Sequence, residues 1–267
     1  MSAIFSATES RPIDRFAAMA RPAGRPIGYH CWTELLFVHW RLPAALVRPL
    51  LPAGLTLDTL EGDAWVGLVP FWMSRVRPWW SPPVPGVSHF CETNVRTYVH
   101  FRGRDPGVWF FSLDASNSLA LRIARWRWHL PYFRAEMSLE RVGDSIHYGV
   151  RRLGPGIAGP GCAIDAKIGP LLGHETAVRP LPAGRALPGS LEYFLVERYI
   201  LYASPAPGKL LAGRVHHHPY PIREARLETI HETLLAASQL APQAPPCHTV
   251  FSDGVDVEIF PLQPVRL

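Results

Sequence analysis

Alternating apolar and polar residues recur along this chain in short runs, and such runs predict β-strands with one buried face. The pattern predicts strands over 31–40, 55–60, 64–73, 90–101, 107–113, 132–141, 145–152, 199–202, 209–217, 223–233 and 255–260. Tight turns around Gly62 and Gly143 join neighbouring strands into hairpins. Many strands of similar length with few helices favour a closed, mainly antiparallel sheet.

Helical segments are few and short. A proline begins the segment 43–51, and apolar residues recur at helical spacing over 117–128. Ser190 is a candidate N-cap for a helix that runs towards Glu197. The fold class is therefore expected to be mainly β, of the α+β kind.

The remaining segments define the domain organisation. Residues 1–27 predict a flexible N-terminal arm, followed by a single domain over 28–267. Residues 153–188 are rich in Gly and Pro and predict a long irregular insertion. Trp79 and Trp80 lie in a Pro-rich loop, where they cap a pocket mouth or form an interface patch; the sequence leaves both open.

The predicted strand over 90–99 carries an unusual polar face. Because side chains alternate, Glu92, Asn94, Arg96 and Tyr98 share one face, and Thr and Val residues occupy the other. One interpretation is a solvated strand with a surface ion pair. The other is the polar lining of a small-molecule pocket, and the very apolar segments on both sides of the strand favour it.

This row supplies the candidate site. Arg96 would hold a carboxylate or carbonyl oxygen, because its planar guanidinium matches such groups. Glu92 would orient Arg96 or carry a proton, so these two are the candidate catalytic residues. The candidate ligand-binding residues that complete the lining are Asn94, Tyr98, Tyr132 and His129.

Composition narrows the class of protein. Hydrophobic residues make up 48% and charged residues 18% of the 267 residues, which supports a sizeable core and excludes global disorder. The net charge of +5 is spread over scattered arginines, with Lys167 and Lys209 as the only lysines, so no nucleic-acid partner is predicted. The expected partner is a small molecule, and a homo-oligomer is left open.

Localisation follows from what the sequence lacks. No apolar run reaches the roughly 20 residues of a membrane span, and the first residues lack the apolar core of a secretory signal. The four cysteines show no paired spacing. A cytoplasmic protein with free thiols and no membrane partner is expected.

The run His216-His217-His218 is the candidate metal motif, since His216 and His218 share a face on a strand. No third ligand has suitable spacing, which favours packing or pocket hydrogen bonds over a metal site. Nucleotide-binding and nucleophile-elbow motifs are absent as well. We therefore predict no metal and no other cofactor.

Six motifs between about His30 and Arg266 resemble the YqjF-like proteins, a family of domains of unknown function (DUF2071). They are Leu50-Leu51-Pro52-Ala53-Gly54-Leu55, Trp65-Val66-Gly67-Leu68-Val69-Pro70-Phe71, Glu92-Thr93-Asn94-Val95-Arg96-Thr97-Tyr98-Val99, Gly107-Val108-Trp109-Phe110-Phe111-Ser112-Leu113-Asp114, His129-Leu130-Pro131-Tyr132-Phe133 and Glu197-Arg198-Tyr199. That family looks like a branch of the acetoacetate decarboxylase-like superfamily. The resemblance implies a cone-shaped antiparallel β-barrel with a few flanking helices and a buried central cavity.

The resemblance also implies that the catalytic lysine of the superfamily is lost here. Enzymes of that superfamily form a Schiff base through a lysine in a Phe-Pro-Lys-Lys type motif, whose similar segment here reads Leu130-Pro131-Tyr132-Phe133. Lys167 and Lys209 match no such motif, whereas Glu92 corresponds to the cavity glutamate of the superfamily. The expected protein binds a small carbonyl- or carboxylate-bearing molecule without a Schiff-base lysine.

Three hypotheses for its function remain. The first is an enzyme that uses the polar row for non-covalent acid–base chemistry, such as enolisation, isomerisation or cyclisation. The second is a ligand-binding or sensory protein without chemistry, and the third is a metal-dependent enzyme that uses His216 and His218. A strongly raised pKa of Glu92 in a closed cavity favours the enzyme. An ion pair between Glu92 and Arg96 favours the binding or structural role.

Overall fold

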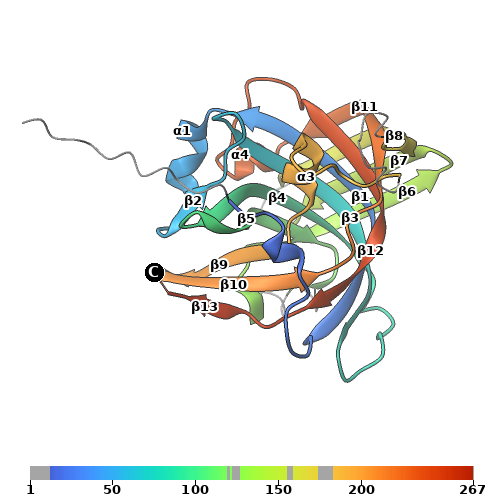
Figure 1. Cartoon of the computed structure of the whole chain (residues 1–267). Coiled ribbons are helices and arrows are strands. Elements are labelled where there is room, and N and C mark those ends of the chain that lie inside the picture. Colours follow the sequence, from blue (N-terminus) through green and yellow to red (C-terminus); the bar gives the residue numbers. More distant parts are fainter. Residues whose placement is uncertain (1–12, 119–120, 122–126, 155–158, 174–182, 267) are drawn as a thin grey trace, which may run out of the picture.

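The computed structural model describes residues 13–118, 121, 127–154, 159–173 and 183–266. One large sheet dominates it, as predicted (Figure 1). Its strands are β1 (Gly28–Leu42), β2 (Leu55–Leu57), β3 (Ala64–Pro78), β4 (Phe90–Phe101), β5 (Arg104–Ala115), β6 (Tyr132–Val142), β7 (Ser145–Arg152), β8 (Gly161–Leu171), β9 (Ile200–Ala206), β10 (Lys209–His216), β11 (Ile222–Glu232), β12 (His248–Ile259) and β13 (Gln263–Val265).

The helices are short: α1 (Ala44–Val47), α3 (Leu191–Val196), α4 (Leu234–Ala237) and two 3₁₀ turns, Ala17–Met19 and Arg48–Leu50. The Ser190 hydroxyl accepts a hydrogen bond from the Tyr193 amide, so Ser190 caps α3 as predicted. Within the described ranges, no helix is long and apolar enough to cross a membrane. The helix predicted over 117–128 falls largely on residues outside those ranges.

The sheet closes on itself. Its strand order is β13-β10-β9-β5-β6-β7-β8-β11-β12-β1-β3-β4-β2, and two further pairings, β10–β12 and β4–β5, join strands that are distant in this order. Strands β1, β3, β4, β5, β9, β10 and β12 therefore form a closed circuit of paired neighbours. The pairings are antiparallel except those of β5 with β6 and β9, which are parallel.

Strand β4 is the structural centre of this circuit, because both of its faces are buried. Every residue from Phe90 to Val99 is buried. Val95 packs into a cluster that contains Leu36 and Leu68, whereas Tyr98 belongs to a second cluster with Phe37. The polar row of β4 is thus enclosed by protein.

The segment 153–188, predicted as irregular, contains strand β8, and this prediction is wrong. Strand β8 pairs with both β7 and β11. Its side chains alternate between buried and exposed, and the buried ones are Cys162, Ile164, Ala166 and Ile168. The alternation is weak in the sequence because small residues occupy half of these positions, Pro160 precedes the strand and Pro170 lies near its end.

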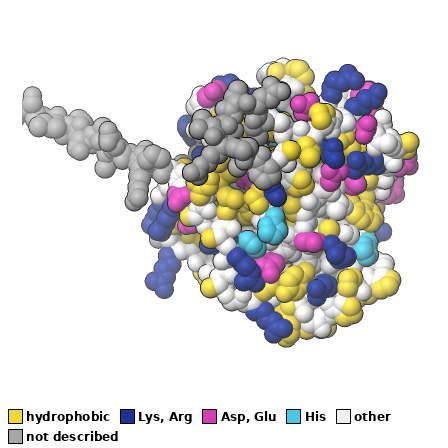
Figure 2. Space-filling model, turned by 45° about the vertical axis from the view of Figure 1, so that its right-hand side comes forward, with side chains coloured by type: hydrophobic (Ala, Val, Ile, Leu, Met, Phe, Trp, Pro, Cys, Tyr) yellow, Lys and Arg dark blue, Asp and Glu magenta, His cyan; other side chains and the backbone are white. Residues whose placement is uncertain are grey.

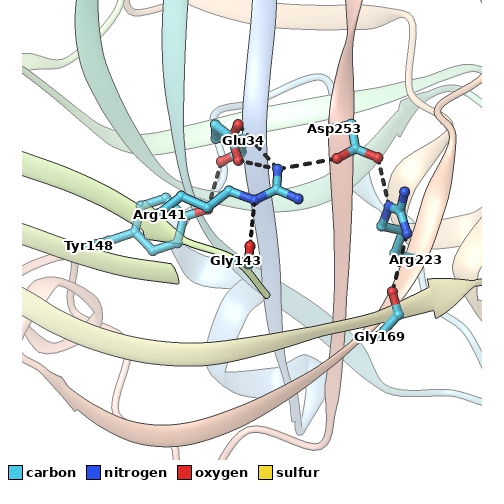
Figure 3. Close-up of polar contacts among 7 residues, drawn as sticks. All are labelled: Glu34, Arg141, Gly143, Tyr148, Gly169, Arg223 and Asp253. Atoms are coloured by element: carbon cyan, nitrogen blue, oxygen red, sulfur yellow. Dashed lines mark hydrogen bonds and ion pairs between the residues drawn. The ribbon is translucent and has the colours of Figure 1, made fainter. Parts of the chain in front are cut away.

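A polar network joins the β6–β7 hairpin to the closed circuit (Figure 3). Arg141 of β6 donates to the carboxylates of Glu34 on β1 and Asp253 on β12, at 3.0 and 3.2 Å. Asp253 also accepts from Arg223 of β11 at 2.7 Å, and the Tyr148 hydroxyl donates to the Glu34 carbonyl at 2.7 Å. Glu34 has a φ of 53° at an irregularity in the β1–β3 ladder, which directs its carbonyl towards β7.

Candidate functional site

A cavity of about 670 Å³ is lined by side chains from all seven strands of the closed circuit. Its lining is mostly apolar, with contributions such as Trp32, Phe71 and Phe110. The polar groups among the lining residues include Glu92, Asn94, Arg96, Tyr132 and Arg198. An apolar cavity with a few convergent polar groups is typical of a small-molecule site.

Strand β4 places three residues of the predicted row in this lining. Glu92, Asn94 and Arg96 are 3%, 5% and 9% exposed, and Tyr132 at the start of β6 joins them. Tyr132 reaches the cavity because β6 runs parallel to β5, with Tyr132 opposite Leu113. The apolar face that alternates with the row packs into the core, as the pattern predicts.

Glu92 is a neutral acid at pH 7. The Tyr132 hydroxyl donates to its Oε2 atom at 3.1 Å. Burial raises the pKa of Glu92 to about 8; the hydrogen bond from Tyr132 opposes this shift and the charge of Asp114 adds to it. A carboxyl group with a pKa near neutrality can both donate and accept a proton under physiological conditions.

Arg96 forms no ion pair with Glu92. Its Nη2 atom donates to the Leu195 carbonyl at 3.1 Å, and its guanidinium lies 5.4 Å from the centre of the Phe37 ring. The Nε atom of Arg96 and the Oδ1 atom of Asn94 are buried, with no hydrogen-bond partner among the described residues. Buried polar groups without partners are unfavourable in a finished core, so this arrangement is typical of a binding site.

A second buried guanidinium lines the cavity, that of Arg198. Its Nη1 atom donates to Asp58 at 2.8 Å, and its Nε atom donates to the Phe194 carbonyl at 2.8 Å. Its Nη2 atom is buried without a partner in the described part of the chain. Asp58 also accepts two hydrogen bonds from Arg15, at 2.6 and 2.7 Å, so the segment before β1 helps to hold Arg198 in place.

Sequence reasoning missed the role of Arg198. The residue lies within the Glu197-Arg198-Tyr199 motif, which was the one available signal. Its neighbour Glu197 is also buried, and burial raises its pKa to about 7, although the Tyr199 hydroxyl and the Tyr220 amide donate hydrogen bonds to it. Two buried guanidinium groups at one cavity favour an anionic ligand group.

Two predicted ligand-binding residues are not part of the cavity lining. Tyr98 is fully buried, and its hydroxyl lies 2.8 Å from the Nε2 atom of His39. His129 is exposed, with a φ of 51°. The loop that carries Trp79 and Trp80 lines the cavity while both rings remain exposed, which places this loop at the mouth.

The two lysines lie away from the site. Lys167 is exposed on β8, 3.5 Å from Glu228, and Lys209 is exposed at the start of β10. Neither lines the cavity. The position that resembles the lysine motif is occupied by Tyr132, which contacts Glu92.

The histidine run borders a separate cavity of about 450 Å³. The ring centres of His216 and His218 are 6.5 Å apart, and histidine, basic and acidic side chains are interspersed on the face shown in Figure 2. The Nδ1 atom of His217 lies 2.8 Å from the His218 carbonyl. Within the described ranges, no group of three or more His, Cys, Asp or Glu side chains is placed to hold a metal ion.

The fold resembles the acetoacetate decarboxylase-like class, as the sequence motifs implied. The enduracididine biosynthesis enzyme MppR, complexed with pyruvate, aligns over 91% of both chains with a TM-score of 0.58 and 15% identity. Acetoacetate decarboxylase from Legionella pneumophila aligns over 94% of both chains, with a TM-score of 0.58 and 15% identity. An acetoacetate decarboxylase-like enzyme from Sphingomonas wittichii gives a TM-score of 0.59 at 13% identity, over 91% of this chain and 94% of that chain.

The family is shown by sequence. The family described as uncharacterized conserved protein, DUF2071, matches residues 30–256. The uncharacterized protein YqjF of Bacillus subtilis is 36% identical over 243 residues, which cover 91% of this chain and 94% of YqjF. The chain therefore belongs to the DUF2071 family.

Proposed function

We propose that this protein is an enzyme that binds a small carbonyl compound bearing a carboxylate and moves a proton at the carbon next to the carbonyl. The observation that carries the proposal is the state of Glu92. It is a buried carboxyl group with a pKa of about 8, it contacts Tyr132, and no basic side chain among the described residues bonds to it. An ion pair with Arg96 would have favoured a binding or structural role.

The ligand class follows from the rest of the lining. Arg96 and Arg198 each have a buried N–H without a partner in the described structure, and both suit a carboxylate. The apolar remainder of the 670 Å³ cavity suits an apolar body larger than the anionic group. A 2-oxo acid with an aromatic or aliphatic side chain combines these features, and the pyruvate complex of MppR involves the simplest 2-oxo acid.

The reaction needs no covalent intermediate. The ionised Glu92 takes a proton from the carbon next to the carbonyl, and the electrons of that C–H bond pass into an enolate. A guanidinium of the cavity stabilises the enolate oxygen. Glu92 then returns the proton to carbon or to oxygen, so the net reaction is an enolisation or an isomerisation. A pKa of about 8 suits both halves of this transfer.

Hydrogen exchange tests the proposal. Phenylpyruvate in D₂O is followed by proton NMR, and the wild type is expected to accelerate exchange at its methylene carbon over buffer. Glu92→Gln is expected to lower this rate at least about 100-fold, because the proton acceptor is lost. Glu140→Gln, which changes an exposed carboxylate on β6, is the matched control and is expected to retain the wild-type rate.

Two outcomes contradict the proposal. Exchange by the wild type no faster than in buffer, with phenylpyruvate bound, would support the ligand-binding protein instead. Exchange by Glu92→Gln at the wild-type rate would show that another group moves the proton.

A further inference from the structure

The cavity residue Arg198 shares its carboxylate partner with a residue of the N-terminal segment. Asp58 lies directly after β2, and its Oδ2 atom accepts a hydrogen bond from Arg198 Nη1 at 2.8 Å. The same carboxylate accepts two hydrogen bonds from Arg15: Nη1 donates to Oδ2 at 2.6 Å, and Nη2 donates to Oδ1 at 2.7 Å. One carboxylate therefore lies between two guanidinium groups, and Arg15 occupies its Oδ1 atom.

These three residues lead from the surface to the cavity. The side chain of Arg15 is 24% exposed, whereas those of Asp58 and Arg198 are each 2% exposed. Arg198 lines the main cavity, and Arg15 and Asp58 do not. The backbone amide of Asp58 donates to the Tyr98 carbonyl at 2.9 Å, which fixes Asp58 against strand β4. Arg15 can therefore act on a ligand only through Asp58 and Arg198.

Arg15 belongs to a segment, residues 13–27, that is attached to the rest of the protein at further points. The guanidinium carbon of Arg15 lies 4.9 Å from the centre of the Phe194 ring in α3. The Nη2 atom of Arg214 on β10 donates to the Ala18 carbonyl at 3.1 Å. These contacts do not involve Asp58, so the segment has attachments of its own beside the ion pair.

The charges around Asp58 leave an excess of positive charge at the cavity. Burial alone would raise the pKa of Asp58, but the hydrogen bonds and charges of Arg15 and Arg198 hold it below its ordinary value. Burial lowers the pKa of Arg198 and the charge of Asp58 raises it, and a guanidinium keeps its proton in proteins. Two cations therefore share one anion.

The bonding of Arg198 leaves one donor group free. Its Nε atom donates to the Phe194 carbonyl and its Nη1 atom to Asp58, both at 2.8 Å. Within the part of the chain that the structure describes, its buried Nη2 atom has no partner. A buried donor without a partner is unfavourable unless a ligand supplies an acceptor.

The ion pair of Asp114 and Arg152 shows the alternative arrangement. Arg152 binds both oxygens of Asp114, at 2.7 and 2.8 Å. At Asp58, Arg15 already occupies the oxygen that Arg198 would need for a second bond of this kind. Arg198 therefore forms one bond to its carboxylate instead of two, and this explains why its Nη2 donor remains unpaired.

We propose that Arg15 keeps Arg198 available to the ligand. By occupying Oδ1 of Asp58, Arg15 prevents a two-bond ion pair between Asp58 and Arg198 and leaves the Nη2 donor of Arg198 for the carboxylate of the ligand. The inference rests on the proposed function, in which the guanidinium groups of the cavity hold that carboxylate. Arg15 is a positioning residue, because it contacts the partner of Arg198 and not the ligand.

The test compares two ligands that differ in one group. Phenylpyruvate carries the carboxylate and phenylacetone lacks it, and calorimetry measures the dissociation constant of each. Arg15→Met releases Oδ1 of Asp58 to Arg198 and is expected to weaken phenylpyruvate binding about 3- to 10-fold, an effect typical of coupling within one ion-pair network. Binding of phenylacetone is expected to change less than about 2-fold.

Arg21→Met is the matched control. Arg21 lies in the same segment and pairs with Glu258 at 2.6 Å, and it does not line the main cavity. Its removal weakens an attachment of the segment without touching Asp58, so both dissociation constants are expected to stay unchanged. Phenylpyruvate binding as weak as that of Arg15→Met would show that attachment of the segment matters and not the occupied carboxylate oxygen, and would overturn the inference.

A double variant separates the proposed role from a merely structural one. Asp58→Asn in the Arg15→Met background leaves a single side-chain oxygen for Arg198, so Nη2 is free again. This variant is expected to bind phenylpyruvate within about 2-fold of the wild type. Its melting temperature is expected to fall below that of Arg15→Met, because Arg198 has lost its counter-ion. Affinity and stability then change in opposite directions, which a structural role does not produce.

The possible failures are distinguishable. Unchanged phenylpyruvate binding by a folded Arg15→Met variant would overturn the inference, as would a folded double variant that binds phenylpyruvate as weakly as Arg15→Met does. A wild type that binds phenylpyruvate no tighter than phenylacetone would overturn the proposed role of the cavity guanidinium groups as well, and with it the ligand class of the proposed function.

Discussion

The two faces of the β4–β5 ladder carry buried carboxyl groups in opposite situations. On one face, Asp114 of β5 accepts two hydrogen bonds from Arg152, at 2.7 and 2.8 Å, and the guanidinium of Arg152 stacks 3.8 Å from the Phe133 ring. On the other face, Glu92 of β4 has a tyrosine for a partner, and none of the arginines in the described part of the chain pairs with it, although Arg96 lies on the same strand. Asp114 is opposite Thr93, the residue next to Glu92.

The difference separates a structural acid from a chemical one. Both hydrogen bonds of the Asp114 carboxylate come from the planar guanidinium of Arg152, so the charge of Asp114 is compensated within this ion pair. Glu92 stays protonated instead, and the arginines of its cavity retain donors without partners in the described structure. A fully paired carboxylate stabilises one conformation, whereas an unpaired one beside a cavity can exchange a proton with a ligand.

Breaking the ion pair of Asp114 and Arg152 is expected to have the largest effect on the free energy of unfolding. Arg152→Met leaves Asp114 buried without its partner, which typically lowers the free energy of unfolding by about 3–5 kcal/mol. Urea unfolding measures it. Arg151→Met, at the exposed neighbouring position, is the control and is expected to change the value by less than about 0.5 kcal/mol. A loss below about 1 kcal/mol for Arg152→Met would show that the ion pair of Asp114 and Arg152 does not have the structural role given to it here.

The pH dependence of the free energy of unfolding tests whether Glu92 is protonated in the folded protein. The pKa of Glu92 is higher in the folded state, about 8, than its ordinary value of 4.5, so the folded state binds the proton more strongly. The contribution of Glu92 to stability is fully present below pH 4.5 and declines as pH rises towards 8; between pH 6 and 8 it falls by about 2 kcal/mol.

Glu92→Gln is expected to remove this slope, because the amide does not titrate. Unfolding curves at pH 6, 7 and 8 for the wild type and the variant measure the difference, with Glu140→Gln as the exposed carboxylate control. Parallel pH profiles for the wild type and Glu92→Gln would mean that Glu92 is ionised in the folded protein, and the comparison with Asp114 would fail.

Arg96→Met is expected to affect the ligand more than the fold. The variant loses one hydrogen bond to the Leu195 carbonyl, while Met packs against the Phe37 ring, so the free energy of unfolding changes by about 1 kcal/mol or less. Phenylpyruvate binding is expected to weaken about 10- to 100-fold. Arg104→Met, at an exposed position of β5, is the matched control. A stability loss as large as that of Arg152→Met would place Arg96 among the structural arginines.

The last prediction is that a treatment which traps Schiff bases has no effect on the protein. Borohydride treatment in the presence of acetoacetate is expected to leave the mass of the protein unchanged, because Lys167 and Lys209 do not line the cavity. Mass spectrometry of the intact protein measures this. A trapped adduct on either lysine would show that the amine of that lysine, rather than Glu92, is the reactive group of the protein.

The sequence by itself determined the strands and the polar row. Alternation along β4 predicted that Glu92, Asn94 and Arg96 share a face, because the side-chain period of a strand is set by its own backbone. The motif set identified the family and the fold, which the comparisons confirm. Strand β8 was missed because its buried face includes small residues, whose burial leaves a weak pattern.

Only the tertiary structure decided which polar groups meet. Tyr98 continues the row of β4, yet its hydroxyl contacts His39, 59 positions away, rather than the cavity. The β4–β5 ladder shifts its register between Val95 and Arg96, and no local pattern reports such a shift. Arg198 reaches the cavity through Asp58, 140 positions away in sequence. Strand pairing and burial bring these groups together, and burial also sets the protonation of Glu92, so the site depends on contacts that a linear pattern does not contain.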